Sequence, residues 1–287
     1  MPFATASDNV RLYFEEAGSG TPILFIHEFA ADYASWEHQV RYFSRGYRCI
    51  VYSARGYTPS DVPEKPDAYS YKHFYTDAIA VLDHLKIEAA HLVGLSMGAY
   101  SALQVGINAP KRARSLTFAG AGSGFEADRL KAFRDTCMAH ATEMERGGSD
   151  EVAKLTGTSP GRIPFLVKDP RGFKDFYDAL AKHDAQGSAN TQRGFQGARP
   201  PISEFKDAMN KLKVPTLIIV GDEDDGCIAP SLFMKQHIAP SGLAMFPKTG
   251  HVLNQEEPAL FNETVGKFLQ LADAGRWPDR DPRSIRV

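Results

Sequence analysis

The sequence predicts an α/β architecture in which a mostly parallel, twisted β-sheet is flanked by helices and carries a helical insertion. Three observations predict it. Short apolar runs bounded by turns alternate with longer segments of helical periodicity. Several of the short runs are continuously apolar, which is typical of strands buried on both faces. The alternation is interrupted once, between residues 120 and 214, where helical periodicity continues without a buried strand.

The expected strands differ in pattern because they differ in burial. Residues 10–15 alternate apolar and polar side chains, as in a strand with one buried face. Residues 22–27 form a continuous apolar run, as in a strand with two buried faces. We expect strands at residues 10–15, 22–27, 48–53, 90–94, 114–119, 215–221 and 243–246.

Helices are expected where apolar residues recur every three or four positions. Phe74, Ala78 and Leu82 share one such face, and residues 97–108 form a helix that stops before Pro110. The same spacing predicts helices around residues 36–43 and at residues 258–271.

This pattern divides the chain into a core, a cap and a tail. Residues 1–120 and 214–274 are expected to form one α/β core. Residues 121–213 are helical and rich in aromatic side chains, so we expect them to form a cap inserted into that core. The C-terminal tail, residues 275–287, is rich in Arg, Asp and Pro, and we expect it to be loosely ordered.

Composition excludes several classes of protein. The chain has 287 residues, is 43% hydrophobic, and has a formal net charge of -2, so it is not intrinsically disordered. No apolar stretch reaches the roughly 18 residues of a membrane span, and the balanced charge disfavours nucleic acid as a partner. The three cysteines and the histidine spacings match no disulfide framework and no metal site. With no signal peptide recognisable, we expect a cytoplasmic protein.

The strongest local motif is Gly94-Leu95-Ser96-Met97-Gly98. It follows an expected strand and begins an expected helix, which is the context that a G-x-S-x-G nucleophile elbow requires. A tight turn of this kind exposes the serine hydroxyl beside the N-terminus of a helix, where backbone N–H groups and the helix dipole favour an oxyanion. We therefore expect Ser96 to be a nucleophile.

A nucleophilic serine requires a base, and the base requires an acid that orients it. In this kind of fold the acid and the histidine follow the serine along the chain. His251 follows the last expected strand and is the expected base. The acid is expected in the acidic loop after the strand at residues 215–221, where we prefer Asp224 and keep Asp222 and Asp225 as alternatives.

The loop after the strand at residues 22–27 contains Glu28 and Phe29. We expect the backbone N–H groups of Phe29 and Met97 to donate to the oxyanion that forms when Ser96 attacks an acyl carbon. In the expected cap, Phe125, Phe165 and Phe176 are expected to line an apolar substrate pocket, although the same aromatic side chains could serve only to pack the cap onto the core.

Together these segments resemble the α/β-hydrolase superfamily, in its capped, esterase-like bacterial branch. The resemblance extends from about residue 10 to residue 271. It implies a Ser96, Asp224, His251 triad, because the family's acid usually stands three residues after a glycine such as Gly221, and it implies the oxyanion roles of Phe29 and Met97. The motifs that carry it are His27-x-Phe29, Arg55-Gly56-Tyr57-x-x-Ser60-Asp61, Gly94-x-Ser96-x-Gly98, Gly221-x-x-Asp224, and Gly250-His251 followed by Glu256, Glu257 and Pro258.

The sequence departs from the family's usual pattern within these motifs. Ser53 stands where aspartate is usual, and Thr58 replaces a common glycine. Glu28 replaces the glycine that usually follows the loop histidine. We slightly favour a Glu28 side chain that turns away and forms a salt bridge elsewhere. The alternative is that it points into the site, where it would contact substrate, orient water or tune His251.

The expected function is hydrolysis of carboxylic esters of small to medium, partly apolar molecules through an acyl-enzyme. The resemblance implies that no cofactor is needed. The alternatives are a C–C bond or lactone hydrolase with the same triad, and a non-catalytic ligand-binding protein on the same fold. Dehalogenase and epoxide hydrolase relatives are disfavoured because they place an aspartate where Ser96 stands. We expect a small-molecule ester as the partner, no nucleic acid or membrane, and a monomer or homodimer.

Overall fold

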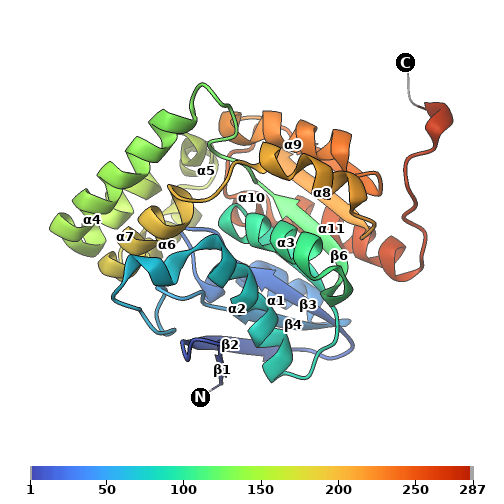
Figure 1. Ribbon diagram of the computed structural model, residues 1–287, viewed down its shortest axis with the longest axis horizontal. Helices are drawn as coiled ribbons and strands as arrows, with labels where there is room; N and C mark the ends of the chain where they lie inside the picture. The colour runs from blue at the N-terminus through green and yellow to red at the C-terminus, as the bar shows by residue number, and fades with distance from the viewer. Residues whose placement is uncertain (1, 285–287) are drawn as a thin grey trace.

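An eight-stranded sheet forms the centre of the computed structural model, which describes residues 2–284 (Figure 1). The strand order is β1-β2-β4-β3-β5-β6-β7-β8. β2 is antiparallel to both β1 and β4, whereas all neighbours from β4 to β8 are parallel. The strands are β1 (Phe3–Thr5), β2 (Arg11–Ala17), β3 (Thr21–Ile26), β4 (Tyr47–Tyr52), β5 (Ala90–Leu95), β6 (Ala113–Ala119), β7 (Thr216–Gly221) and β8 (Ser241–Phe246).

Helices cover both faces of the sheet and build a separate layer at one side of it (Figure 1). The predicted α/β fold class is confirmed, and every expected strand is present. The short β1 and the helix α9 were not expected. The helices are α1 (Glu37–Phe43), α2 (Tyr71–His84), α3 (Met97–Asn108), α4 (Leu130–Gly157), α5 (Ile163–Lys168), α6 (Pro170–Leu180), α7 (Ala185–Thr191), α8 (Lys206–Lys211), α9 (Asp225–His237), α10 (Leu253–Glu256) and α11 (Pro258–Asp273).

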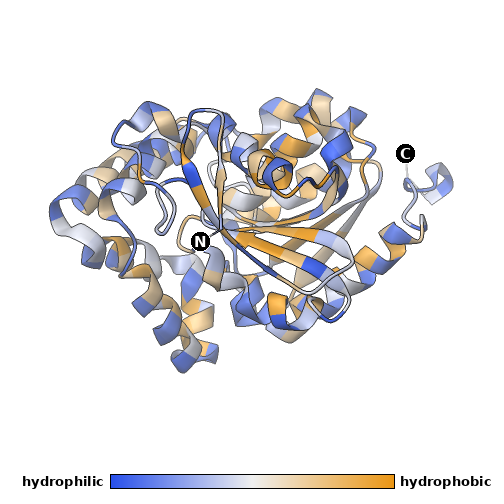
Figure 2. Ribbon diagram, turned by 90° about the horizontal axis from the view of Figure 1, so that it is seen from below, coloured by the Kyte–Doolittle hydropathy of each residue, from blue (hydrophilic) through white to orange (hydrophobic). Residues whose placement is uncertain are grey.

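The sheet carries a hydrophobic core on each face because successive strand residues point to opposite sides. In β3, Leu24 and Ile26 pack into the core beneath α2 and α3, whereas Ile23 and Phe25 pack against α1 and α11. The central strands are therefore mostly apolar, as Figure 2 shows for the centre of the molecule. Burial on both faces explains why the runs were readable in the sequence.

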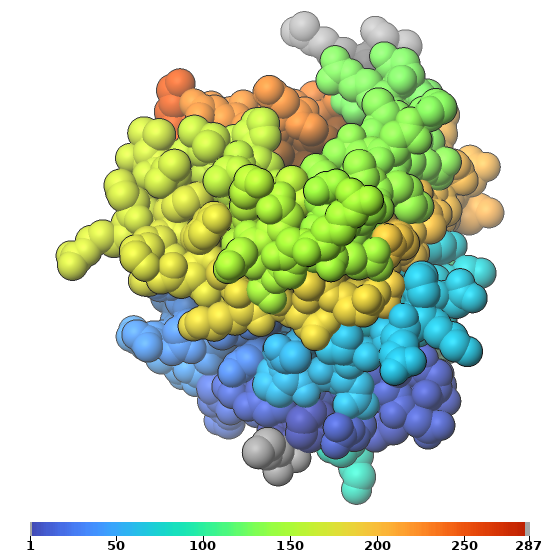
Figure 3. All heavy atoms as spheres, turned by 90° about the vertical axis from the view of Figure 1, so that its left-hand side faces the viewer, coloured from blue at the N-terminus to red at the C-terminus, as the bar shows by residue number. Residues whose placement is uncertain are grey.

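The helices α4 to α7 all lie between β6 and β7 in the chain. α4 contacts both α6 and α7, and α5 contacts α6, so these helices form one layer. Seen from their side, this green-to-yellow layer covers much of the face of the molecule (Figure 3). The last part of the segment differs, because α8 packs against α9 of the sheet domain.

The described part of the C-terminal tail is more tightly held than we expected. Trp277 stacks edge-on against Phe268 of α11, and its indole Nε1 donates to the Pro240 carbonyl at 3.1 Å. The expectation of a loose tail is therefore wrong for this side chain; residues 285–287 lie outside the described residues. No helix within residues 2–284 is both long and apolar enough to cross a membrane.

Candidate active site

The Ser96 turn connects β5 to α3. Close packing of the backbone requires glycine two residues before the serine and two residues after it. Ser96 has φ 52° and ψ -109°, a backbone conformation that costs about 1–3 kcal/mol for a residue with a side chain. A Cβ on Gly94 would overlap the Gly98 carbonyl oxygen, and a Cβ on Gly98 would overlap that of Ile26. The spacing of the two glycines therefore follows from close backbone packing, and the half-buried Ser96 is held at the carboxyl end of β5.

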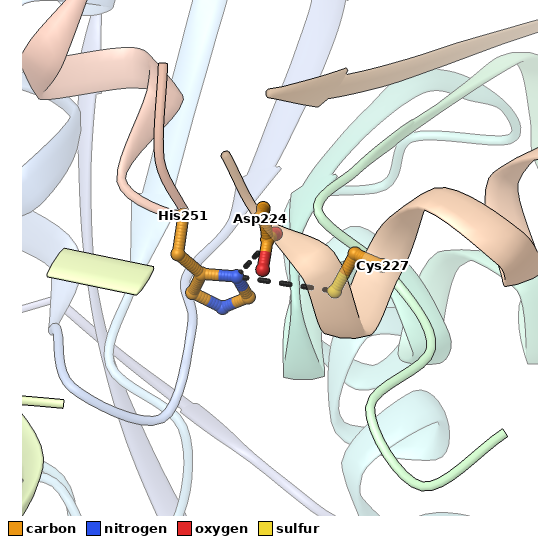
Figure 4. Close-up of side chains that lie close together, drawn as sticks. All are labelled: Asp224, Cys227 and His251. Atoms are coloured by element: carbon orange, nitrogen blue, oxygen red, sulfur yellow. Dashed lines mark hydrogen bonds and ion pairs between the residues drawn. The ribbon is translucent and has the colours of Figure 1, made fainter. Parts of the chain in front are cut away.

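His251 and Asp224 come together from the loops that follow β8 and β7 (Figure 4). His251 Nδ1 lies 2.7 Å from Asp224 Oδ2, and both residues are buried. The backbone N–H of His251 donates to the Gly161 carbonyl at 2.7 Å, which fixes the loop from the side of the insertion. Of the alternative acids, Asp222 and Asp225 are exposed, and Asp222 instead accepts from the Thr249 N–H. The structure thus pairs Asp224 with the histidine.

The electrostatics of this pair favour a charged histidine. Burial lowers the pKa of His251, but the adjacent Asp224 carboxylate and the more distant Glu28 raise it, and the net shift is upward. Burial raises the pKa of Asp224, but the charge of His251 and its hydrogen bond outweigh this and lower it. An ionised acid that stabilises an imidazolium is what a general base needs in an acyl-transfer reaction.

A second histidine, His27, fixes the loop after β3. The Ala54 N–H donates to its Nε2 at 2.9 Å, so its Nδ1 carries the proton and donates to the Glu28 carbonyl at 2.6 Å. Burial lowers the pKa of His27 to about 4, which keeps the ring neutral. The following residue, Phe29, is buried beside the Ser96 turn. Within residues 2–284, neither the Phe29 nor the Met97 backbone N–H donates a hydrogen bond to the chain.

Glu28 lies inside the site, contrary to the interpretation that the sequence favoured. Its side chain is 1% exposed and its Oε2 lies 3.7 Å from His251 Nε2. It does form a salt bridge, but with Arg162, which reaches down from the insertion and is itself buried. Glu28 Oε1 and Arg162 Nε are buried without a hydrogen-bond partner among the described residues. The Glu28–Arg162 ion pair therefore lies beside His251 with part of its hydrogen-bonding capacity unused.

A cavity of about 240 Å³ opens at Ser96 and His251 beneath the insertion. Its wall is more polar than the apolar pocket we expected. A larger cavity of about 520 Å³ lies behind Asp224, but Ser96 does not line it, so the smaller one is the candidate substrate site. The smaller cavity is lined by Glu28, Phe29, Ser96, Ser123, Phe133, Thr136, Cys137, His140, Leu155, Thr156, Ser159, Arg162, Gln192, Gln196 and His251.

The three phenylalanines expected in the pocket lie elsewhere. Phe125 packs against Phe233 of α9, with ring centroids 5.2 Å apart. Phe165 and Phe176 pack together in the interior of the insertion. The spacing of these aromatic side chains in the sequence does not distinguish a ligand surface from a core, and the structure shows the packing alternative. Phe165 and Phe176 pack helices of the insertion against each other, and Phe125 packs against the sheet domain.

The residues that sequence reasoning missed come mostly from the insertion. Arg162 belongs to the 3₁₀ turn Pro160–Arg162, far along the chain from the Ser96 motif. Gln192 and Gln196 belong to a π-helical turn, Gln192–Gln196, and His140 comes from α4. π-helical turns are rare and often mark functional sites, but their sequences carry no reliable signature. Only the packing of the insertion on the sheet reveals these residues.

Asp224, Cys227 and His251 form a cluster whose polar atoms lie within 4.8 Å of one another (Figure 4). Metal binding would require a thiolate and a free ring nitrogen. Burial raises the pKa of the Cys227 thiol well above its ordinary range, and its Sγ donates to the Gly120 carbonyl at 3.2 Å. The His251 Nδ1 hydrogen bonds to Asp224. The donor set therefore fits a hydrogen-bonded acid–base pair better than a metal centre.

Comparisons with known proteins agree with this fold. The sequence model of the family described as "alpha/beta hydrolase fold" matches residues 21–258. The chain is 29% identical to 3-oxoadipate enol-lactonase 1 of Acinetobacter baylyi over 86% of this chain and 88% of that protein. It is 35% identical to Epoxide hydrolase 1 of Siraitia grosvenorii, covering 92% and 96%. A thermophilic esterase from Thermogutta terrifontis superposes with a TM-score of 0.84 at 22% identity, covering 94% and 98%. The chain belongs to the alpha/beta hydrolase family.

Proposed function

We propose that this protein hydrolyses carboxylic esters by way of an acyl-enzyme, with Ser96 as nucleophile, His251 as base and Asp224 as the orienting acid. One observation carries the proposal: the buried Asp224–His251 pair and the strained Ser96 turn meet at one cavity. The similarity to an esterase and an enol-lactonase supports the same class of reaction. A protein that only binds ligands would have no need for this arrangement.

The proposed reaction has two acyl-transfer steps. Ser96 Oγ bonds to the ester carbon while His251 Nε2 accepts the hydroxyl proton, and the amides of Phe29 and Met97 hold the oxyanion. The tetrahedral intermediate collapses, the C–O bond to the alcohol breaks, and His251 returns the proton to the leaving oxygen. Water then attacks the acyl-Ser96 ester, His251 again takes a proton, and the acid is released with Ser96 regenerated.

The resting geometry requires a small rearrangement. Among the described residues, Ser96 Oγ makes no hydrogen bond, and His251 Nε2 faces Glu28. Catalytic hydrogen bonds often tighten only when substrate binds. We propose that the helical insertion acts as a cap over the cavity, because it supplies Arg162 and most of the polar wall. A closed cap excludes water and strengthens the electrostatic interactions inside.

A lactone is a cyclic ester and fits the same chemistry, so lactone hydrolysis is the second candidate; the enol-lactonase relative supports it. Epoxide opening is disfavoured although one relative is named an epoxide hydrolase. A serine that opened an epoxide would become an alkyl ether, which water does not cleave. An acyl-serine ester, by contrast, hydrolyses with the histidine as base.

The test of the proposed function is the release of p-nitrophenol from p-nitrophenyl esters of increasing acyl length. We expect turnover of acetate and butyrate and much slower turnover of octanoate and longer chains, because the cavity holds only about 240 Å³. A preference for long acyl chains would contradict the assignment of this cavity. Absence of turnover on the esters and on small lactones would contradict the proposed function.

We further propose that Glu28 raises the pKa of His251 during catalysis. Because His251 must be neutral to act as a base, kcat/KM rises with pH through its pKa. The change Glu28→Gln removes a negative charge 3.7 Å from Nε2, so the pKa falls and the acidic limb of the profile moves to lower pH. The measurement is the pH dependence of kcat/KM for p-nitrophenyl acetate.

The matched control is Glu223→Gln, which makes the same chemical change at an exposed carboxylate that pairs with Lys248. We expect its profile to superpose on that of the wild type. An unshifted acidic limb in Glu28→Gln, or a shift of equal size in Glu223→Gln, would show that Glu28 does not act on the base.

A further inference from the structure

A second buried cation lies close behind the cavity wall. Arg199 follows the π-helical turn and is 6% exposed, with its guanidinium carbon 4.9 Å from the Tyr100 ring centroid and 5.6 Å from that of Phe133. Within residues 2–284, no carboxylate forms an ion pair with it. Burying a charge without a counter-ion is costly, so an unpaired buried guanidinium calls for a partner.

The hydrogen bonds of Arg199 leave part of the guanidinium free. Its Nη2 donates to the Ser123 carbonyl at 2.8 Å, and its Nε donates to Gln196 Oε1 at 3.3 Å. Among the described residues, Nη1 has no hydrogen-bond partner. Both partners are neutral, so they satisfy donors without compensating the positive charge.

Arg134 adds a second positive charge beside the first. It lies on α4, and its Nη2 is 3.5 Å from the Arg199 carbonyl oxygen. Its Nε is buried without a partner, and it too forms no ion pair with any described residue. Burial, together with the neighbouring Arg134 charge, lowers the pKa of Arg199, yet a guanidinium stays charged at neutral pH.

Arg199 does not itself line the cavity at Ser96, but its neighbours do, so its charge lies close behind the wall. Ser123, Phe133 and Gln196 all contact Arg199 and all line the cavity at Ser96. The other arginine of the site, Arg162, is already neutralised by Glu28. The positive charge behind this part of the wall is therefore not compensated by a described carboxylate.

We propose that the cavity binds esters or lactones that carry a free carboxylate, and that Arg199, with Arg134, provides the charge that recognises this group. The inference rests on the proposed ester hydrolysis for the position of the reacting bond. Arg199 is then a specificity residue that acts on the far end of the substrate, because it lies behind the wall on the Ser123 and Gln196 side and not at the triad.

The test compares two esters of similar length, monomethyl glutarate and methyl pentanoate, whose hydrolysis is followed by proton release. We expect the wild type to have the higher kcat/KM for the anionic ester. In Arg199→Met this preference should fall by on the order of 10-fold, because an uncompensated positive charge close behind the cavity wall is removed. The loss should appear mainly in KM, while the rate with methyl pentanoate stays close to that of the wild type.

The matched control is Arg193→Met, since Arg193 lies in the π-helical turn just before Arg199 but already pairs with Glu145. It should keep the preference for the anionic ester. A wild type that prefers methyl pentanoate would overturn the proposal, even if Arg199→Met failed to fold. So would equal losses on both esters in a folded Arg199→Met protein, because those would indicate a packing role.

A binding measurement separates this inference from the proposed function. Calorimetric titration of the wild type with glutarate requires no turnover, and we expect binding that weakens by at least about 10-fold in Arg199→Met. Sulfate serves as the probe for charge alone. Equal binding of sulfate and glutarate would replace the carboxylate site with a general anion site, and no binding of glutarate would overturn the proposal.

Discussion

Replacing Ser96 with alanine is expected to reduce kcat for ester hydrolysis by about 10⁵-fold or more, because the acyl-enzyme cannot form. The loss should appear in kcat far more than in KM, since the cavity and its polar wall are unchanged. Some acceleration over water should remain, because the oxyanion donors and binding still act. The measurement is the steady-state rate of p-nitrophenyl acetate hydrolysis, with the wild type and the variant in parallel.

Ser101→Ala is the matched control for this experiment. Ser101 lies in α3, the helix that Ser96 precedes, and its hydroxyl donates to the Met97 carbonyl at 3.0 Å without lining the cavity. We expect nearly wild-type turnover from it. Unchanged turnover in a folded Ser96→Ala protein would show that Ser96 is not the nucleophile and would contradict the proposed function.

The change Asp224→Asn is expected to reduce kcat by about 10⁴-fold. An asparagine keeps the shape of the side chain but can donate to His251 Nδ1, which places the ring proton on Nε2 and removes the lone pair that accepts the Ser96 proton. The carboxylate is buried and 2.7 Å from that nitrogen, so no water can substitute for it easily. The rate should be compared at a pH above the His251 pKa.

The matched controls are Asp222→Asn and Asp225→Asn, which make the same change at two other aspartates near Asp224. Both carboxylates are exposed, and neither contacts His251. We expect both variants to stay within a few-fold of the wild type. If either of them lost activity on the scale expected for Asp224→Asn, the acid would be assigned to the wrong residue.

Much of the sheet was predictable because burial on both faces leaves a simple pattern. The runs that became β3 and β5 are almost continuously apolar, which is typical of strands buried on both faces. β1 was missed because three residues are too short to show an alternation. α9 was not predicted because Pro230 stands inside it, where a proline removes an intrahelical hydrogen bond and usually ends or kinks a helix.

The Ser96 turn was predictable for a different reason. Its two glycines are required by close contacts with residues nearby in the chain and with the neighbouring strand. The constraint therefore appears as a short local motif in the sequence. Asp224 and His251 follow strands whose carboxyl ends meet at one edge of a parallel sheet. The order of the elements therefore brought the predicted pair together without any knowledge of side-chain packing.

The cavity wall was not predictable because it depends on how the insertion packs on the sheet domain. Phe165 and Phe176 bury their rings within the insertion, while polar residues such as Gln192 turn toward Ser96. Both choices satisfy the same helical periodicity. The Glu28–Arg162 ion pair joins residues 134 positions apart in the chain, so the local sequence around either residue does not predict the pair.

The most direct measurement of the central claim is where a reactive acyl-group mimic becomes attached. The wild type should be treated with a fluorophosphonate, digested, and analysed by peptide mass spectrometry. The account predicts one adduct, on the peptide that contains Ser96, with strongly slowed labelling in Asp224→Asn and none in Ser96→Ala. Labelling at another side chain, or labelling that persists in Ser96→Ala, would contradict the assignment of Ser96 as the nucleophile.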